Sequence, residues 1–231
     1  MNPFEIFFDQ LITKGAYKDV LKGLLKTVEI AVGGLIIGIL LGTVIAVVRV
    51  MPKYNTLPKI LDKICNVYVA LFRGTPMVVQ LLLGYWVLLP ALHISANSLA
   101  VAIVMFGLNS AAYVSEMMRS GIQSVDIGQL EAARALGLPY KTSMLKIVIP
   151  QSIKNILPTL GNEFIVLVKD TTVASFIAVH DLTYELKHIA DATYEYLVPY
   201  IALAIIYLIM VIGITFGIRA IERRLRRSEK Q

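Results

Sequence analysis

Long stretches without a charged residue constrain the fold of this chain more than any other feature. Three of them run from Ile30 to Val48, from Ile94 to Ser115 and from Leu197 to Ile218. Each is close to the roughly 20 apolar residues that a helix needs to cross a bilayer. Charged residues make up only 16% of the chain, against about 25% in a typical soluble domain. The sequence therefore predicts an all-α integral membrane protein.

Two further apolar regions are interrupted. Ile64–Leu89 contains Arg73 and Pro76, and Asn155–Val179 contains Glu163. Proline removes a backbone donor, so a carbonyl that it frees within a membrane must be satisfied inside the protein. Broken helices of this kind are common along the substrate pathways of transporters, although a structural kink with Arg73 at the membrane interface fits the same pattern. Counting both regions, we predict five membrane-spanning helices.

The basic residues suggest how these helices are oriented. Lysine and arginine are frequent in residues 49–63, 119–154 and 219–227, and the positive-inside rule places such segments in the cytoplasm. Five spans then put the amino terminus outside and the carboxyl terminus in the cytoplasm. The net charge of +6 is explained by this topology, so no nucleic-acid partner is expected.

The spans divide the chain into three parts. Residues 1–26 form an amphipathic amino-terminal segment, residues 27–219 the transmembrane domain, and residues 220–231 a basic cytoplasmic tail. Within the first part, lysines recur every four residues and favour a helix lying on the bilayer surface, with a merely solvated helix as the alternative: Lys14, Lys18, Lys22 and Lys26. In the first span, Gly34, Gly38 and Gly42 form a smooth strip, which predicts close approach of another helix.

A polar segment, Gln129–Pro150, lies between the apolar regions within a cytoplasmic loop of about residues 120–154. We call it the central polar loop. Gly137 and Pro139 stop the helix that precedes them, and a second helical segment follows. We expect a knob with an exposed tip, built around a short helix at roughly Arg134–Lys141, which another protein can grip.

Three motifs in this chain resemble signatures of ABC importer permeases of the polar amino acid uptake subfamily, the histidine, glutamine and arginine type. The central polar loop resembles the EAA loop in Glu131-Ala132-Ala133, Gly137, Ile147 and Pro150. Met144 stands where that motif ordinarily has an aromatic residue, and methionine fills an apolar pocket comparably. The other two motifs are Phe72–Pro76 and Lys169–Ser175. The resemblance covers about residues 20–220.

The resemblance implies a type I ABC importer permease in the bacterial cytoplasmic membrane. It implies two ATP-binding subunits, a second permease subunit (a homodimer is favoured) and an extracytoplasmic amino acid binding protein. The chain would not be an enzyme: it has no P-loop, so ATP and Mg²⁺ would be bound by the partner subunits. Coupling to the ATPase would fall to the central polar loop, at Glu131, Ala132, Ala133, Arg134, Gly137, Leu138, Pro139 and Tyr140.

Glu163 is the candidate substrate-binding residue. A carboxylate within a membrane is costly and marks a functional site by default, and Glu163 is suited to accept the ammonium group of an amino acid. An internal ion pair with Lys169 or Arg73 is the alternative. A basic amino acid is the favoured cargo, and further contacts are expected from Asn162, Tyr113, Ser115 and Thr75.

Two rival functions remain open at this stage. An ion-coupled secondary amino acid carrier would use Glu163 for a proton or sodium ion, but it predicts inverted repeats and the sequence has none. A membrane scaffold or receptor would explain the loop but not the broken helices. No metal site is expected, because Cys65 is the single cysteine and the histidines lack ligand partners at helical spacing: His93, His180 and His188.

Overall fold

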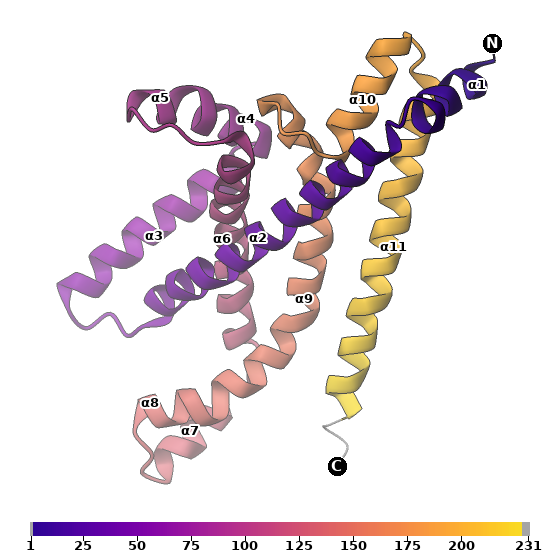
Figure 1. Ribbon diagram of the computed structural model, residues 1–231. Helices are drawn as coiled ribbons and strands as arrows, with labels where there is room; N and C mark the ends of the chain where they lie inside the picture. The colour runs from indigo at the N-terminus through magenta and orange to yellow at the C-terminus, as the bar shows by residue number, and fades with distance from the viewer. Residues whose placement is uncertain (1, 228–231) are drawn as a thin grey trace.

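The computed structural model describes residues 2–227, and every regular element in that range is helical. Figure 1 shows the arrangement. The elements are α1 (Pro3–Phe8), η1 (Asp9–Thr13), α2 (Tyr17–Val50), α3 (Thr56–Gly74), α4 (Met77–Leu83), η2 (Gly84–Leu88), α5 (Leu89–Ala91), α6 (Ser98–Gln123), α7 (Ile127–Ala135), α8 (Tyr140–Ser143), η3 (Met144–Val148), α9 (Ile149–Asp170), η4 (Thr171–Ile177), α10 (Leu182–Thr193) and α11 (Leu197–Arg227).

The closest helix pair is α2 with α6, as the glycine strip predicts. A Cβ atom on Gly34 would lie 3.0 Å from Phe106, one on Gly38 2.6 Å from Ser110, and one on Gly42 2.9 Å from the Ala111 carbonyl oxygen. Real Cβ atoms essentially never come within 3.0 Å of another atom, and the Gly34 distance stands at that limit. Only glycine therefore allows the two helices to pack at this distance.

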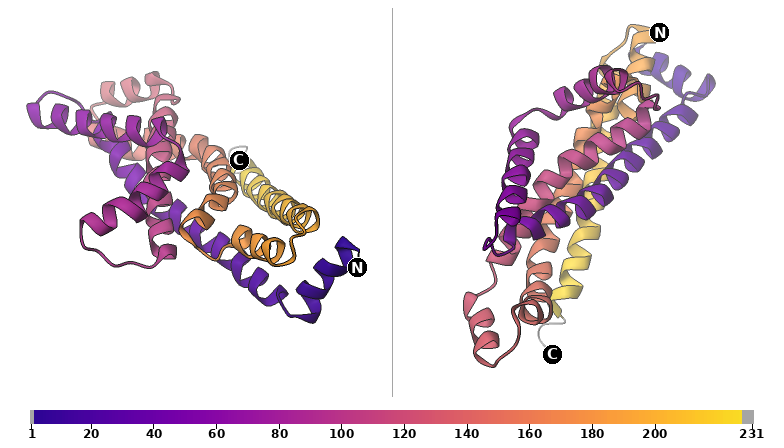
Figure 2. Two further views of the ribbon diagram at one scale, coloured as in Figure 1. Left: turned by 90° about the horizontal axis from the view of Figure 1, so that it is seen from above. Right: turned by 90° about the vertical axis from the view of Figure 1, so that its left-hand side faces the viewer.

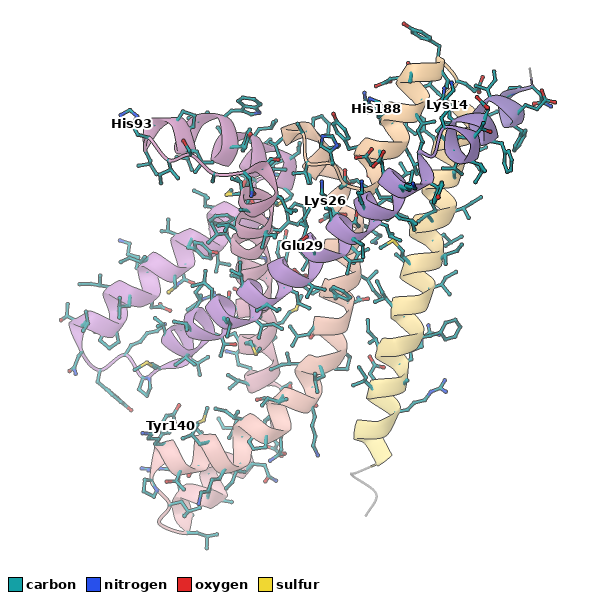
Figure 3. All side chains as sticks on the ribbon, in the orientation of Figure 1. Lys14, Lys26, Glu29, His93, Tyr140 and His188 are labelled. Carbon is teal, nitrogen blue, oxygen red and sulfur yellow. The ribbon has the colours of Figure 1, made fainter. Side chains whose placement is uncertain are left out.

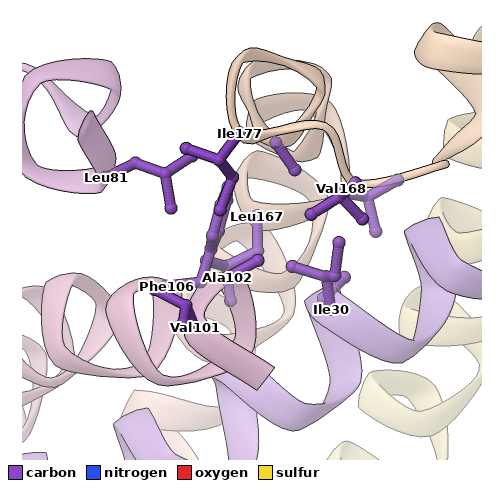
Figure 4. Packing of buried hydrophobic residues seen from close by; sticks show 11 residues of the cluster. Ile30, Leu81, Val101, Ala102, Phe106, Leu167, Val168 and Ile177 are labelled. Atoms are coloured by element: carbon purple, nitrogen blue, oxygen red, sulfur yellow. The ribbon is translucent and has the colours of Figure 1, made fainter. Parts of the chain in front are cut away.

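The main hydrophobic core joins α2, α4, α6, α9 and η4. Figure 4 shows Ile30, Leu81, Phe106 and Ile177 converging on one another from four of these elements. All four side chains are fully buried. This core anchors the short helices that follow the break in the second apolar region.

The break lies where it was predicted, between α3 and α4. The two helical parts, Thr56–Gly74 and Met77–Ala91, are bent by 109° at residues 75–76. Pro76 precedes the first turn of α4, in an extended conformation. The second apolar region is therefore a sharply angled pair of helices and not a straight rod.

Three helices are long and apolar enough to cross a membrane: Tyr17–Val50, Ser98–Gln123 and Leu197–Arg223. The bent pair makes four if it counts as one span. Helix α9 falls below this threshold because charged side chains lower its hydropathy, so the count of five spans stays a prediction.

The two ends of the molecule carry different short helices. Figures 1 and 2 show α1 and α10 together at the end with the amino terminus, and α7 and α8 at the opposite end, where α11 finishes. In Figure 3, Lys14 and His188 accordingly lie far from Tyr140. The central polar loop is thus at the same end as the basic tail, of which residues 228–231 lie outside the described range.

Three of the amino-terminal lysines lie on α2, and Lys14 lies in the connection that precedes it. Helix α2 starts at Tyr17 and runs without interruption past residue 26, so the boundary drawn there from the sequence falls inside one continuous helix. Phe4, Phe8 and Ile12 are exposed on α1 and η1. An apolar exposed face of this kind is what a segment on a bilayer surface presents.

Candidate functional site

Glu163 is buried at the centre of the molecule. It lies on α9 with 5% of its surface exposed, and its Oε1 accepts a hydrogen bond of 2.9 Å from the Ser110 hydroxyl on α6. No ion pair of Glu163 with Lys169 or Arg73 is found in residues 2–227. The alternative of an internal ion pair is therefore not seen in the described chain, where the hydrogen-bond partner of the buried carboxylate is neutral.

Ser110 was not among the residues predicted from the sequence. It belongs to a polar stripe of α6 with Asn109 and Tyr113, which lie within about 100° of one another around the helix, whereas Ser115 lies on another face. Its packing against Gly38, described above, directs the hydroxyl toward α9. A sequence shows the stripe but not which of its members meets the carboxylate.

The other predicted contacts of Glu163 lie in different surroundings. Ser115 is buried, and its hydroxyl donates to the Ala112 carbonyl of its own helix at 2.8 Å. Asn162 is exposed on α9. Tyr113 lines the cavity described below. Within the described chain, none of these three side chains is hydrogen-bonded to Glu163.

Thr75 belongs to a separate polar cluster that closes the break between α3 and α4. The Gln80 amide donates to the carbonyl oxygens of Phe72 at 2.8 Å and Thr75 at 2.9 Å, and to the Thr75 hydroxyl at 2.8 Å. Asn109 of α6 in turn donates to Gln80 Oε1 at 2.9 Å. The backbone groups that the break frees are thus bound by side chains, which leaves none of these carbonyls unpaired.

A cavity of about 900 Å³ opens at the loop end of α6 and α9. We call it the inner cavity. Its walls combine both signs of charge, and its lining includes Arg73, Tyr113, Glu116, Lys154, Thr159 and Glu222.

Glu116 is the centre of an ion-pair cluster at the wall of the inner cavity. Its carboxylate lies 2.6 Å from Arg49 of α2, 2.8 Å from Arg119 of α6 and 3.9 Å from Arg73 of α3. The Arg73 guanidinium also lies 5.4 Å from the centre of the Tyr113 ring. Three helices are therefore tied to one carboxylate.

The central polar loop forms a helical corner. Helix α7 is capped by Asp126, whose side chain accepts from the Gly128 N–H at 2.9 Å, and it ends at Ala135. Gly137 follows with a φ of +85°, and the N–H groups of Gly137 and Leu138 return to the carbonyls of Arg134 and Ala133. This is a glycine-terminated helix end.

The short helix expected at Arg134–Lys141 is therefore wrong in detail. Residues 136–139 form a turn, because Gly137 leaves the helical conformation and Pro139 cannot restore it. Ala133 faces inward with 3% exposed, whereas Leu136 at the corner is 83% exposed. Glu131, Ala132, Arg134, Leu138, Pro139 and Tyr140 are also exposed.

The end of the molecule opposite the loop holds another buried carboxylate, Asp181. It is fully buried and caps α10 by accepting from the Tyr184 N–H at 3.0 Å. Its second oxygen, Oδ2, has no hydrogen-bond partner in the described chain. Burial raises the pKa of Asp181 to about 6. In residues 2–227, no cluster of three or more histidine, cysteine or acidic side chains that could hold a metal ion is found.

Comparison with known proteins gives a consistent result. Residues 34–227 match the family model described as binding-protein-dependent transport system inner membrane component. The chain is 39% identical to the arginine transport system permease protein ArtQ of Bacillus subtilis over 210 residues, which cover 91% of this chain and 94% of that protein. It is 36% identical to the putative glutamine transport system permease protein GlnP of Rickettsia prowazekii over 206 residues, which cover 89% and 92% respectively.

Solved structures show the same fold. The crystal structure of an amino acid ABC transporter with histidines contains a chain that superposes with a TM-score of 0.84 at 37% sequence identity, covering 93% of this chain and 97% of that one. An inward-facing structure of the MetNI methionine ABC transporter gives a TM-score of 0.71 at 18% identity, covering 89% and 95%. At that low identity the second likeness concerns the fold alone.

Proposed function

The chain belongs to the family of binding-protein-dependent transport system inner membrane components, and from this premise we propose that it is the permease subunit of an ATP-driven importer of polar amino acids. As in its relatives, the chain is a transport subunit of the inner membrane and not an enzyme. The hydrolysis of ATP belongs to a partner ATPase, which in this proposal also binds the nucleotide and its Mg²⁺.

The buried carboxylate of Glu163 carries the proposal. A lone carboxylate inside a membrane protein is costly unless a positive charge joins it. Its hydrogen bond from Ser110 supplies a neutral donor only. The ammonium group that every free amino acid carries would supply the missing charge, so Glu163 is the residue we assign to substrate.

A basic amino acid is the favoured cargo within this class. The relative with 39% identity is named for arginine, and the one with 36% for glutamine. The inner cavity holds Glu222 in addition to basic groups, and a carboxylate of this kind is suited to guide a cationic side chain. Four further residues stay candidates for contacts with the cargo that form when the pathway changes shape: Asn162, Tyr113, Ser115 and Thr75.

Coupling to the ATPase is assigned to the central polar loop. Its corner presents the apolar side chains of Leu136, Leu138 and Tyr140 to solvent, at 83%, 37% and 39% exposure. Exposed apolar residues around a rigid turn are typical of a surface that another protein covers. We expect this corner to sit in a groove of the ATPase and to transmit its closure to α6 and α9.

A second permease subunit is expected to complete the pathway. In the most apolar part of α11, none of the residues is buried within this chain. Such a helix faces either lipid or another subunit, and in this proposal part of its surface contacts a second permease. A homodimer is favoured, with an extracytoplasmic binding protein on the face of α1 and α10.

The experiment that tests the proposal is uptake of radiolabelled arginine and glutamine into proteoliposomes. These contain the permease, its cognate ATPase and its binding protein. We expect uptake to require ATP. Glu163→Gln should abolish uptake while the complex still assembles, and Gly137→Asp should uncouple ATP hydrolysis from transport.

Glu29→Gln is the matched control, because Glu29 is an exposed carboxylate on α2 that should be replaceable without loss of uptake. Normal transport by Glu163→Gln would move the substrate site elsewhere. Uptake that persists without ATP but follows an ion gradient would favour the ion-coupled carrier, with Glu163 as its proton or sodium site.

A further inference from the structure

The inner cavity lies next to Glu163 along two helices. Thr159, which lines the cavity, precedes Glu163 by four residues on α9, and Tyr113, which also lines it, follows Ser110 by three residues on α6. At about 1.5 Å per residue, both steps amount to roughly one helical turn. The step from Glu163 to Thr159 and the step from Ser110 to Tyr113 both lead toward the central polar loop. The cavity therefore lies between the carboxylate and that end of the molecule.

The ion-pair cluster beside the cavity has more positive than negative groups. Within residues 2–227, Glu116 is the one carboxylate that forms ion pairs with Arg49, Arg119 and Arg73. Arg49 and Arg119 lie 2.6 Å and 2.8 Å from it, so these two closer guanidinium groups already compensate its negative charge. Arg73 is the third, at 3.9 Å, which is too far for a strong hydrogen bond.

Arg73 also differs from the other two in accessibility. Its side chain is 45% exposed, compared with 10% for Arg49 and 34% for Arg119. Of the three arginines, Arg73 is the one that lines the cavity. A weakly paired guanidinium in a cavity wall is available to an anionic ligand.

Tyr113 holds this guanidinium in place. The cation lies 5.4 Å from the ring centre, within the range of an attractive cation–π contact. Arg73 also sits in the last turn of α3, just before the backbone break. The Tyr113 ring on one side and the end of α3 on the other limit the orientations of the planar Arg73 guanidinium group. The paired N–H groups of a guanidinium match the two oxygens of a carboxylate.

We propose that Arg73, held against Tyr113, binds the α-carboxylate of the amino acid after its ammonium group leaves Glu163. The inner cavity is then an exit station of the pathway, selective for ligands with a carboxylate. This inference rests on the proposed function, because it requires that the cargo is an amino acid. Lys154 and Glu222, on α9 and α11, also line the cavity and would contact other parts of the ligand.

The test compares amino acids with the amines that lack only the carboxylate. Direct binding of radiolabelled arginine and agmatine, and of histidine and histamine, is measured on the permease–ATPase complex in nanodiscs. The binding protein is left out because it discriminates by itself. A charge-assisted contact predicts that each amino acid binds at least about 10-fold more tightly than its amine.

Variants then locate the source of this preference. Arg73→Gln should reduce the preference to about 1 by weakening amino acid binding, and amine binding should persist. Arg73→Lys keeps the charge but not the fork, so an intermediate preference is expected. Lys63→Gln removes an exposed cation of the same helix that does not line the cavity, and should retain the wild-type preference.

Three results would overturn the inference: a wild-type preference in Arg73→Gln, loss of amine and amino acid binding together in an assembled variant, or no preference in the wild type. If Arg73→Gln does not assemble, an unchanged preference in Arg73→Lys decides against the inference. A wild-type complex that imports no amino acid in proteoliposomes refutes the proposed function itself. That outcome is distinguishable from an active importer without carboxylate preference.

Discussion

Gly38 of α2 lies so close to Ser110 of α6 that a Cβ atom on the glycine would stand 2.6 Å from the serine Oγ. The same Oγ donates to Glu163. Helix packing and the geometry of the buried carboxylate therefore depend on one contact. A change at Gly38 should affect both the stability of the protein and its substrate site.

Gly38→Ala is predicted to destabilise the protein by about 1–3 kcal/mol, because the added methyl group meets the Cβ and main chain of Ser110 as well as its hydroxyl. Thermal unfolding of the purified permease in nanodiscs measures this effect. Gly213→Ala is the control, since a Cβ there has open space, and it should unfold at the wild-type temperature or slightly above. Equal unfolding temperatures for Gly38→Ala and Gly213→Ala would show that α2 and α6 pack less tightly at Gly38 than the structure indicates.

Leu136→Asp is predicted to disrupt coupling without unfolding the permease. The side chain is 83% exposed at the corner of the central polar loop, so little packing within the chain is lost. A charge there should prevent a groove of the ATPase from closing over it. Co-purification with the ATPase and cargo-stimulated ATP hydrolysis are the measurements.

The control for Leu136→Asp is Tyr54→Ser, in the connection between α2 and α3. Tyr54 is 90% exposed and lies outside the central polar loop. It should leave ATPase binding unchanged. Normal ATPase binding by Leu136→Asp would place the docking surface elsewhere on the permease.

Asp181→Asn is predicted to stabilise the protein near neutral pH. Burial raises the pKa of Asp181 from 3.8 to about 6, so the folded state keeps a proton that the unfolded state has released. Stability contributed by this residue is therefore highest below about pH 4 and declines as pH rises to about 6. The shift corresponds to a cost of about 2–3 kcal/mol at pH 7.

Asparagine keeps the oxygen that caps α10 but carries no charge. The unfolding temperature of the wild type should thus fall relative to that of Asp181→Asn between pH 4 and pH 6, and the difference should be constant above about pH 7. Asp191→Asn, at an exposed residue of the same helix, serves as the control. A constant difference from pH 4 to pH 8 would contradict a buried, proton-retaining Asp181.

Much of the fold was predictable from local patterns. The apolar runs, the glycine strip and the break at Gly74 to Pro76 each depend on residues close together in sequence, and the structure has all three. The burial of Glu163 followed from its apolar neighbours. Patterns of this kind encode where a helix begins and ends in the sequence and which face it buries.

What could not be predicted depends on contacts between distant segments. Ser110 meets Glu163 across 53 positions of the chain, and Glu116 collects Arg49 and Arg73 from two other helices. The continuity of α2 through residue 26 was missed for a different reason. The lysine spacing suggested a surface helix, but no proline near that position ends it, and the helix runs on to Val50.

Gln80→Leu is predicted to destabilise the region around the break more than any apolar substitution on the surface. Gln80 is 5% exposed, and its amide satisfies the carbonyl oxygens of Phe72 and Thr75 while its oxygen accepts from Asn109. Leucine would deprive the Thr75 carbonyl of its donor and Asn109 of its 2.9 Å acceptor, and the Phe72 carbonyl would keep only the 3.4 Å contact with Asn109. Each such group costs about 1–3 kcal/mol.

A double-mutant cycle with Asn109→Leu makes this prediction specific. Once Gln80 is replaced, Asn109 has lost its 2.9 Å acceptor, so replacing it as well should cost less than it does in the wild type. Gln151→Leu is the control, because in the described chain this exposed glutamine donates only to the Ile147 carbonyl, four residues earlier at the end of η3. Strictly additive unfolding energies for Gln80→Leu and Asn109→Leu would mean that the two amides do not act together, and that the break is held by the core around Leu81 instead.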